Sequence, residues 1–177
     1  MASSQRKNPQ TKKTVLITGA TSGFGTHLAR AFAQAGYAIV LHGRDDKKLR
    51  AVKKEILKKE NINCATVVAD LPKAKGIEAI LSAMRKQNVD ILINNAAIHD
   101  GDIADVFSTN ATSAIALSYG AFKHFTSKNG GIIININSVA GLKGSQGEAL
   151  YASSKFALRG FSESVKEAWL KQGVRMI

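Results

Sequence analysis

Short apolar runs alternate with longer stretches of mixed polarity along most of the chain. The runs are rich in Val and Ile and lack an alternation of polar residues, which is typical of strands buried on both faces of a parallel sheet. They predict six strands, at Thr14–Thr18, Ala38–Leu41, Cys64–Ala69, Ile91–Ile93, Gly131–Ile136 and Val174–Ile177.

The stretches between these strands have helical periodicity. In Asp46–Glu60, for example, Leu49, Val52 and Ile56 share one face of a helix whose other positions are mostly charged. The same reasoning predicts helices at Gly25–Ala35, Asp46–Glu60, Gly76–Lys86, Ala104–Ser127 and Tyr151–Lys171. Strands that alternate with helices, joined by right-handed crossovers, predict an α/β fold with a doubly wound parallel sheet (a Rossmann fold) and the strand order 3-2-1-4-5-6.

The organisation is that of a single domain. Residues 1–13 are polar and aperiodic and include four basic residues, so we predict a disordered basic tail there and one domain over 14–177. No apolar run approaches the roughly 18 residues needed to span a bilayer, and no apolar stretch follows the N-terminal charges. The single cysteine, Cys64, suits a reducing compartment, so we expect a cytoplasmic location.

The net charge of +12 raises nucleic acid and anionic membrane surfaces as partners. Seven of the basic residues lie between Lys47 and Lys59, in a predicted helix, and no recognition motif or interleaved aromatic residue accompanies them. We therefore interpret them as a solvated helix face and expect no specific nucleic-acid partner. A positive field still favours an anionic cofactor or substrate.

A glycine-rich turn follows the first predicted strand. Its sequence, Thr18-Gly19-Ala20-Thr21-Ser22-Gly23-Phe24-Gly25, leads directly into a predicted helix. Gly19 permits a tight turn, Gly23 and Gly25 allow close approach of a pyrophosphate and of a neighbouring strand, and the helix N-terminus presents free N–H groups to an anion. The position in the fold makes this a predicted dinucleotide-binding turn that includes Thr21, Ser22 and Phe24.

The residues after the next two strands bear on the choice of cofactor. Gly43 stands where an acid usually binds the adenosine ribose of NAD, and Arg44 follows it. Arginine pairs well with phosphate, so we expect NADP, with NAD as the alternative. Asp70 and Leu71, at the end of the third strand, are expected beside the adenine. A competing role for Asp70 is to cap the next helix.

Tyr151 and Lys155 are spaced to share one face of a predicted helix. A free tyrosine has a pKa near 10, and a nearby lysine cation stabilises the phenolate and lowers that pKa. Ser138 lies just beyond the fifth strand, at the edge where doubly wound sheets bind ligands. Its hydroxyl can hold a carbonyl oxygen beside the tyrosine, although each residue taken alone is unremarkable on a helix or in a turn.

Taken together and in this order, these pieces resemble the short-chain dehydrogenase/reductase family, in the branch with TGxxxGxG and YxxxK signatures. The matching positions are Thr18–Gly25, Asp70, Asn94–Ala97, Asn110, Ser138, Tyr151 and Lys155. The resemblance covers nearly the whole chain from Thr14 onward.

The resemblance implies roles for the matched residues. Tyr151 is implied as the general acid/base, Lys155 as the residue that binds the nicotinamide ribose, and Ser138 as the group that polarises the substrate oxygen. Asn110 is implied to hold a water that links Lys155 to solvent, and its competing role is local bonding inside a helix. Asn94, Asn95 and Ala96 are implied to lie beside the cofactor and to brace the central strands.

The chain departs from the family pattern at three places. Ala97 stands where the family usually has glycine, and the stretch from Asn94 to Asn110 is shorter than usual, which predicts a reduced pocket wall. The chain also stops at Ile177, so we expect a sheet truncated in its sixth strand. Ala140–Leu150 and Ile98–Asp102 are expected to line the substrate pocket, but they do not select among ketone, steroid, sugar and acyl-thioester substrates.

The favoured function is an NAD(P)-dependent oxidoreductase that transfers a hydride between the nicotinamide and a carbonyl or alcohol. The alternative is a truncated, non-catalytic relative that binds nucleotide or a partner subunit. A nucleic-acid-binding protein rests on charge alone, and a methyltransferase would not need Tyr151 and Lys155 together. The resemblance also implies a homodimer or homotetramer formed through the last two helices, with Phe156, Phe161 and Trp169 as candidate contacts. The histidines are scattered, so no metal site is expected.

Overall fold

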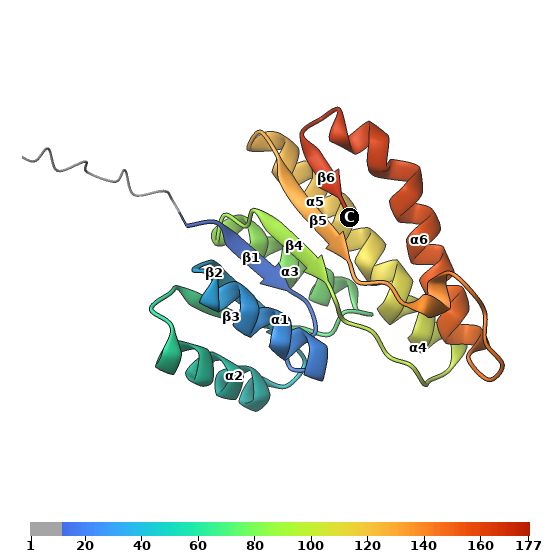
Figure 1. The fold of residues 1–177 in the computed structure, drawn as a ribbon, viewed down its shortest axis with the longest axis horizontal. Helices are drawn as coiled ribbons and strands as arrows, with labels where there is room; N and C mark the ends of the chain where they lie inside the picture. Colours follow the sequence, from blue (N-terminus) through green and yellow to red (C-terminus); the bar gives the residue numbers. More distant parts are fainter. Residues whose placement is uncertain (1–11) are drawn as a thin grey trace, which may run out of the picture.

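The computed structural model describes residues 12–177, which form one parallel sheet with helices on both faces (Figure 1). The strands are β1 (Thr14–Ile17), β2 (Ala38–Gly43), β3 (Cys64–Val68), β4 (Ile91–Asn94), β5 (Gly131–Asn135) and β6 (Val174–Met176). Their order in the sheet is β3-β2-β1-β4-β5-β6, and every neighbouring pair is parallel. The predicted fold class and strand order are confirmed.

The helices are α1 (Gly23–Gln34), α2 (Asp46–Lys59), α3 (Ala74–Lys86), α4 (Ile103–Phe107), α5 (Ser113–Ser127) and α6 (Ala149–Leu170). A π-helical turn, η1 (Ser108–Thr112), joins α4 to α5, and a short 3₁₀ turn, η2 (Val139–Gly141), follows β5. The predicted single helix Ala104–Ser127 is therefore wrong in one respect. It is helical over that range, but η1 widens it where Asn110 turns its side chain towards the backbone of Ile98.

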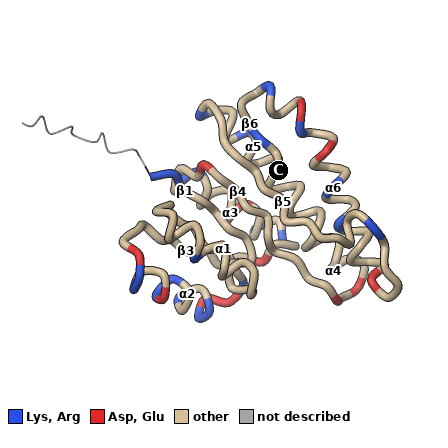
Figure 2. Tube along the Cα trace, in the orientation of Figure 1, with Lys and Arg blue, Asp and Glu red and all other residues tan. Residues whose placement is uncertain are grey.

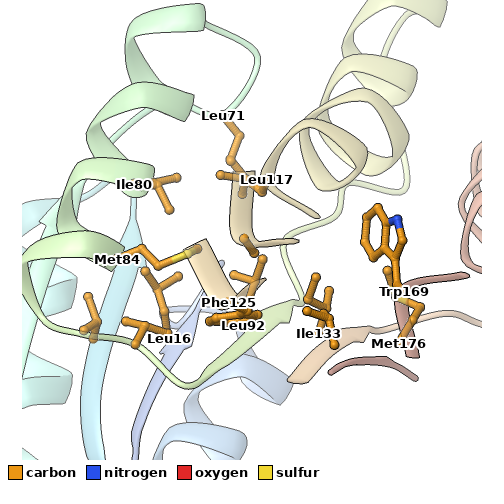
Figure 3. Close-up of a cluster of buried hydrophobic side chains, with 14 residues drawn as sticks. Leu16, Leu71, Ile80, Met84, Leu92, Leu117, Phe125, Ile133, Trp169 and Met176 are labelled. Atoms are coloured by element: carbon orange, nitrogen blue, oxygen red, sulfur yellow. The ribbon is translucent and has the colours of Figure 1, made fainter. Parts of the chain in front are cut away.

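The core has two parts, one on each face of the sheet. On one face, side chains of β1, β4 and β5 pack under α3, α5 and α6, with Leu16, Leu92, Leu117 and Phe125 fully buried (Figure 3). On the other face, the alternate residues of the same strands meet α1 and α2, where the small residues of α1 allow close helix–sheet packing. Both faces of β1 are therefore buried, which explains why its sequence shows no polar alternation.

The charged surface agrees with the interpretation of α2 as a solvated helix face. Figure 2 shows several Lys and Arg positions along α2, interrupted by Asp and Glu, while Leu49 and Ile56 of this helix are buried. Within residues 12–177 no helix is long and apolar enough to cross a membrane. Most of the tail predicted as disordered, residues 1–11, lies outside the described residues.

Candidate active site

The glycine-rich turn joins β1 to α1 and is held by its own side chains. Gly19 has φ of +63°, a conformation that favours glycine. Ser22 caps α1, because its Oγ accepts a hydrogen bond from the Gly25 N–H (3.2 Å) and donates one to the Gly19 carbonyl (2.8 Å). The turn is thus fixed with the N-terminus of α1 at the carboxyl edge of the sheet.

Gly23 and Gly25 serve different needs. A Cβ on Gly25 would collide with the Gly19 carbonyl and lie 2.7 Å from Asn95 Nδ2, so packing within the protein requires glycine there. A Cβ on Gly23 would meet no protein atom within 4 Å. Packing therefore leaves Gly23 unexplained, whereas an anion seated on the first turn of α1 would account for it.

Hydrogen bonds of Thr18 and Asn95 join the loops that follow β1 and β4. Thr18 Oγ1 accepts hydrogen bonds from the N–H groups of Asn95 (2.9 Å) and Ala96 (3.0 Å). In return, Asn95 Nδ2 donates to the carbonyls of Thr18 (2.8 Å) and Gly19 (3.2 Å). These bonds explain the expected bracing role of Asn95 and fix the glycine turn against β4.

His42 is a site residue that the sequence did not single out. It is 2% exposed, accepts a hydrogen bond from the Gly19 N–H at Nδ1 (3.3 Å) and donates from Nε2 to the Ala69 carbonyl (3.1 Å). Burial, with a smaller effect from the nearby Arg44 cation, lowers the pKa of His42 to about 4. The neutral ring therefore ties the glycine turn to β2 and to the end of β3.

A cleft of about 150 Å³ opens above the carboxyl ends of β1, β2 and β3. Gly19, Thr21, Ser22, Arg44, Asp70, Leu71 and Ala96 line it together with His42, Gly43, Pro72, Ala97, Ile98 and Thr109. Seven of the residues expected to bind the cofactor are thus brought together. Gly23, Gly25, Phe24 and Asn95 are not on its wall: Gly25 and Asn95 are buried behind the turn, and Phe24 is 57% exposed on α1.

Arg44 is free to meet an anion. The two acids beside it are engaged elsewhere: Asp45 caps α2 by accepting a hydrogen bond from the Lys48 N–H, and Asp46 pairs with Arg50 at 2.8 Å. Within the described part of the chain, Arg44 itself has no carboxylate within 4 Å. The adjacent acids therefore do not neutralise it.

Asp70 and Leu71 form the opposite wall. The Asp70 carboxylate does not cap α3, whose N-cap is Lys73, so the competing role weighed for it is wrong. It pairs instead with Lys73 at 3.1 Å in a half-exposed position. The Leu71 side chain is 5% exposed, and its carbonyl accepts a hydrogen bond from Ser113 Oγ.

Tyr151 and Lys155 lie on the first turns of α6. Lys155 is 3% exposed, its Nζ donates to the Ile136 carbonyl (2.9 Å), and the same Nζ lies 5.7 Å from the centre of the Tyr151 ring. Burial lowers the pKa of Lys155, and within residues 12–177 no carboxylate lies within 4 Å of it. A buried lysine without a counter-ion is costly for folding and marks a candidate functional site.

Ser138 lies two residues beyond the carbonyl that holds Lys155. Its Oγ accepts a hydrogen bond from the Ala140 N–H (3.2 Å), which leaves its own proton free to donate. Because η2 packs against α6, Ser138 and Tyr151 belong to the same corner of the molecule.

Asn110 is 1% exposed in the π-helical turn. Its Oδ1 accepts from the Ile98 N–H (2.8 Å), and its Nδ2 donates to the Ile98 carbonyl (2.8 Å) and to Ser154 Oγ (3.1 Å). The side chain thus fixes the loop after β4 against α6, next to Lys155. Asn110 thus bonds to residues outside its own helix. Neither of the two expected roles, holding a water or bonding locally within the helix, includes these contacts.

His99 is a second residue that the sequence did not single out. Its ring lies against that of Tyr151, with centres 4.9 Å apart. It also joins the two segments expected to line the substrate pocket, because its Nε2 lies 3.3 Å from Glu148 Oε1. Neighbouring Ala97 is exposed on the cleft wall, and its φ is not positive, so the alanine at this glycine position causes no backbone strain.

The residues present fit a dinucleotide. The glycine turn with its open Gly23, the helix N-terminus and the unpaired Arg44 form one half of the site, and the corner with Ser138, Tyr151 and Lys155 forms the other. The fold and site thus define a dinucleotide-binding α/β domain with a tyrosine–lysine pair. Residues 13–177 match the family model described as short chain dehydrogenase. The chain belongs to the short-chain dehydrogenase family.

Known proteins resemble the chain over most of its length. It is 29% identical to an NADP-dependent 3-hydroxy acid dehydrogenase of Schizosaccharomyces pombe, over 93% of this chain and 69% of that relative. Among solved structures, a bulky-bulky ketone specific alcohol dehydrogenase from Comamonas testosteroni superposes with a TM-score of 0.89 at 25% identity, over 94% of this chain and 71% of the other. A short-chain dehydrogenase from Sphingobium yanoikuyae in complex with NADPH gives 0.87 at 28% identity, over 93% and 68%.

Proposed function

We propose that the protein is an NADP-dependent oxidoreductase that interconverts a carbonyl and an alcohol, with Tyr151 as general acid/base. The observation that carries the proposal is Lys155. Lys155 is 3% exposed, lies beside the Tyr151 ring and has no carboxylate within 4 Å among residues 12–177. Its bond to the Ile136 carbonyl needs a donor but does not need a positive charge. The charge is explained if the free N–H groups of Lys155 bind ribose hydroxyls and the charge stabilises a phenolate.

The cofactor is proposed to be NADP, with NAD as the alternative. It would be held by the glycine turn and the α1 N-terminus at its pyrophosphate, and by Arg44 at the phosphate of its adenosine ribose. Asp70 and Leu71 would flank the adenine. The relatives support this choice, since one is named as NADP-dependent and another was solved with NADPH. When bound, the cofactor supplies or accepts the hydride.

The protein's own residues would manage the proton and the substrate oxygen. The Ser138 hydroxyl, whose proton is free, donates a hydrogen bond to the carbonyl oxygen. The Tyr151 hydroxyl gives its proton to that oxygen during reduction and takes it back during oxidation. Lys155 stabilises the phenolate that remains, and Asn110 holds the loop of Ile98 in place beside α6.

The test is NADPH oxidation by the purified chain against a panel of ketones, 3-oxo acids and sugars. We expect turnover with at least one carbonyl, and a loss of at least about 10²–10⁴-fold in Tyr151→Phe. NADPH binding and the circular dichroism spectrum should be unchanged, because only one hydroxyl is removed. A Tyr151→Phe protein that keeps a substantial part of the activity would refute the assignment. NADPH binding without turnover on any carbonyl would favour the non-catalytic alternative.

Two further expectations belong to the proposal. A homodimer or homotetramer would use α5 and α6, which lie side by side and expose Tyr119 and Phe156. Of the other candidate contacts, Trp169 is 6% exposed and stacks on Phe122, so it belongs to the core. The cytoplasmic location stays a prediction based on the single cysteine, whose thiol is free and half-buried.

A further inference from the structure

His99 is held between two carboxylates. Its Nδ1 lies 2.9 Å from Asp100 Oδ1, and its Nε2 lies 3.3 Å from Glu148 Oε1. An ionised carboxylate only accepts hydrogen bonds, and a neutral imidazole has a single N–H. Both contacts are therefore satisfied together only when the ring is the doubly protonated imidazolium. In agreement, the hydrogen bonds to Asp100 and then Glu148 raise the pKa of His99.

The imidazolium lies against the acid/base residue. The ring centres of His99 and Tyr151 are 4.9 Å apart and the rings are tilted by 38°. Lys155 Nζ lies 5.7 Å from the same tyrosine ring, so Tyr151 has two cationic neighbours. The lysine is buried, whereas the side chain of His99 is 51% exposed.

Glu148 holds the His99 ring at the start of α6. It is the N-cap residue of α6, three positions before Tyr151, where a negative charge is favoured by the helix dipole. Through His99 it ties the loop after β4 to the start of α6. The second tie between the same loop and α6 runs through Ile98, Asn110 and Ser154. His99 can therefore act on Tyr151 in two ways, by packing against its ring and by placing a charge beside it.

We propose that His99, clamped by Asp100 and Glu148, is a positioning residue that fixes the Tyr151 ring and adds a second positive charge beside its phenolate. This inference rests on the proposed function of Tyr151 as acid/base. It predicts that loss of the charge at position 99 disfavours the phenolate, and that loss of the ring alone does not, provided a cation remains.

Two substitutions separate charge from packing. His99→Phe keeps an aromatic ring against Tyr151 but removes the cation, and His99→Arg keeps a cation without the imidazole ring. For one charge on a ring whose centre lies about 5 Å from that of Tyr151, at a partly exposed site, the electrostatic effect corresponds to a shift of roughly half to one pH unit. In alcohol oxidation, which needs the phenolate, the acidic limb of the pH profile should move to higher pH by that amount in His99→Phe. It should stay near that of the unsubstituted protein in His99→Arg.

A second measurement does not depend on turnover. Tyrosinate formation is followed by ultraviolet difference absorbance during an alkaline titration, and the step absent in Tyr151→Phe is assigned to Tyr151. We expect this step at lower pH in the unsubstituted protein and in His99→Arg than in His99→Phe, because an imidazolium that is still protonated when the phenolate forms acts as the arginine does. Equal steps in the unsubstituted protein and His99→Phe would overturn the inference, whether or not the chain turns over a carbonyl. Failure of the proposed function appears separately, as NADPH binding without turnover in the unsubstituted protein.

The state of His99 itself is tested by nuclear magnetic resonance. Its imidazole should titrate above the usual value of 6.5 and return towards it in the double variant Asp100→Asn, Glu148→Gln. A His99 that titrates at or below the usual value in the unsubstituted protein would remove the basis of the proposal.

Discussion

Acid should destabilise this protein through His42. The ring is 2% exposed, and its Nδ1 faces the Gly19 N–H, a donor, so a second proton would have to enter a buried site against another hydrogen. The pKa is accordingly lowered from 6.5 to about 4. The unfolded chain therefore binds a proton between these two values that the folded protein refuses, and the free energy of unfolding falls as the pH falls through this window.

The magnitude follows from the size of the shift. At about 1.4 kcal/mol per pH unit, a difference from 6.5 to about 4 corresponds to about 3 kcal/mol, lost progressively between those two pH values. Because a domain has about 5–15 kcal/mol of stability, the loss should be easy to measure. Protonation of the folded protein, which is reached only near pH 4, would turn Nδ1 from acceptor to donor against Gly19, which should open the glycine turn and weaken NADP⁺ binding at that pH.

The assay is urea denaturation, followed by circular dichroism at several pH values between 7 and 4. It compares the unsubstituted protein with His42→Gln. The variant should be less stable at pH 7 by about 1 kcal/mol, since it loses the acceptor for Gly19. It should then lose less stability on acidification, by about 3 kcal/mol. Parallel stability curves for the two proteins would refute the reasoning, because other groups titrate equally in both. His124→Gln, in the last turn of α5, is the control for the cofactor effect and should leave NADP⁺ binding unchanged; burial lowers the pKa of His124 too, so it is no control for stability.

The remaining predictions concern the cofactor half of the site and the assembly. Gly23→Ala should raise the free energy of unfolding by about 0.4–1 kcal/mol, because its Cβ meets no protein atom, while weakening NADPH binding. Gly25→Ala should lower the free energy of unfolding by about 1–3 kcal/mol, because its Cβ collides with the Gly19 carbonyl. Urea denaturation measures the stabilities, and calorimetric titration measures NADPH binding. Arg44→Ala should weaken NADPH by about 1.5–3 kcal/mol and leave NADH unchanged, with Lys47→Ala as control, and equal losses for the two cofactors would contradict NADP preference. Phe156→Lys should lower the mass measured by light scattering, and a monomeric unsubstituted protein would contradict the proposed α5–α6 interface.

The pattern of apolar residues predicted the fold because it reflects which residues are buried, and the sheet with its covering helices determines that burial. Strands such as Val15–Ile17 are covered on both faces, so their sequences are apolar throughout, and the helix patterns between them fix the crossovers. The break at η1 was not predicted. It depends on the side chain of Asn110 reaching the backbone of Ile98, and no local feature of the segment encodes that contact.

Sequence alone points to those parts of the candidate site whose residues are spaced by local geometry. Tyr151 and Lys155 share a helix face, and the glycine turn is read directly from adjacent residues. His42 and His99 were missed because their partners are distant in sequence. His42 contacts Gly19 and Ala69, and only the pairing of β2 with β1 and β3 brings these together.

The two halves of the site are mechanically joined by a few residues after β4. Asn95 is bonded to the carbonyl of Gly19, in the glycine turn, and three residues later Ile98 is bonded on both backbone groups to Asn110. Asn110 in turn contacts Ser154, one residue before Lys155. Because buried hydrogen-bonded groups resist displacement, we expect a shift of α6 to be passed on to the glycine turn over this short path. Substitutions that loosen the loop after β4 should therefore affect both the proposed cofactor binding and the placement of Tyr151.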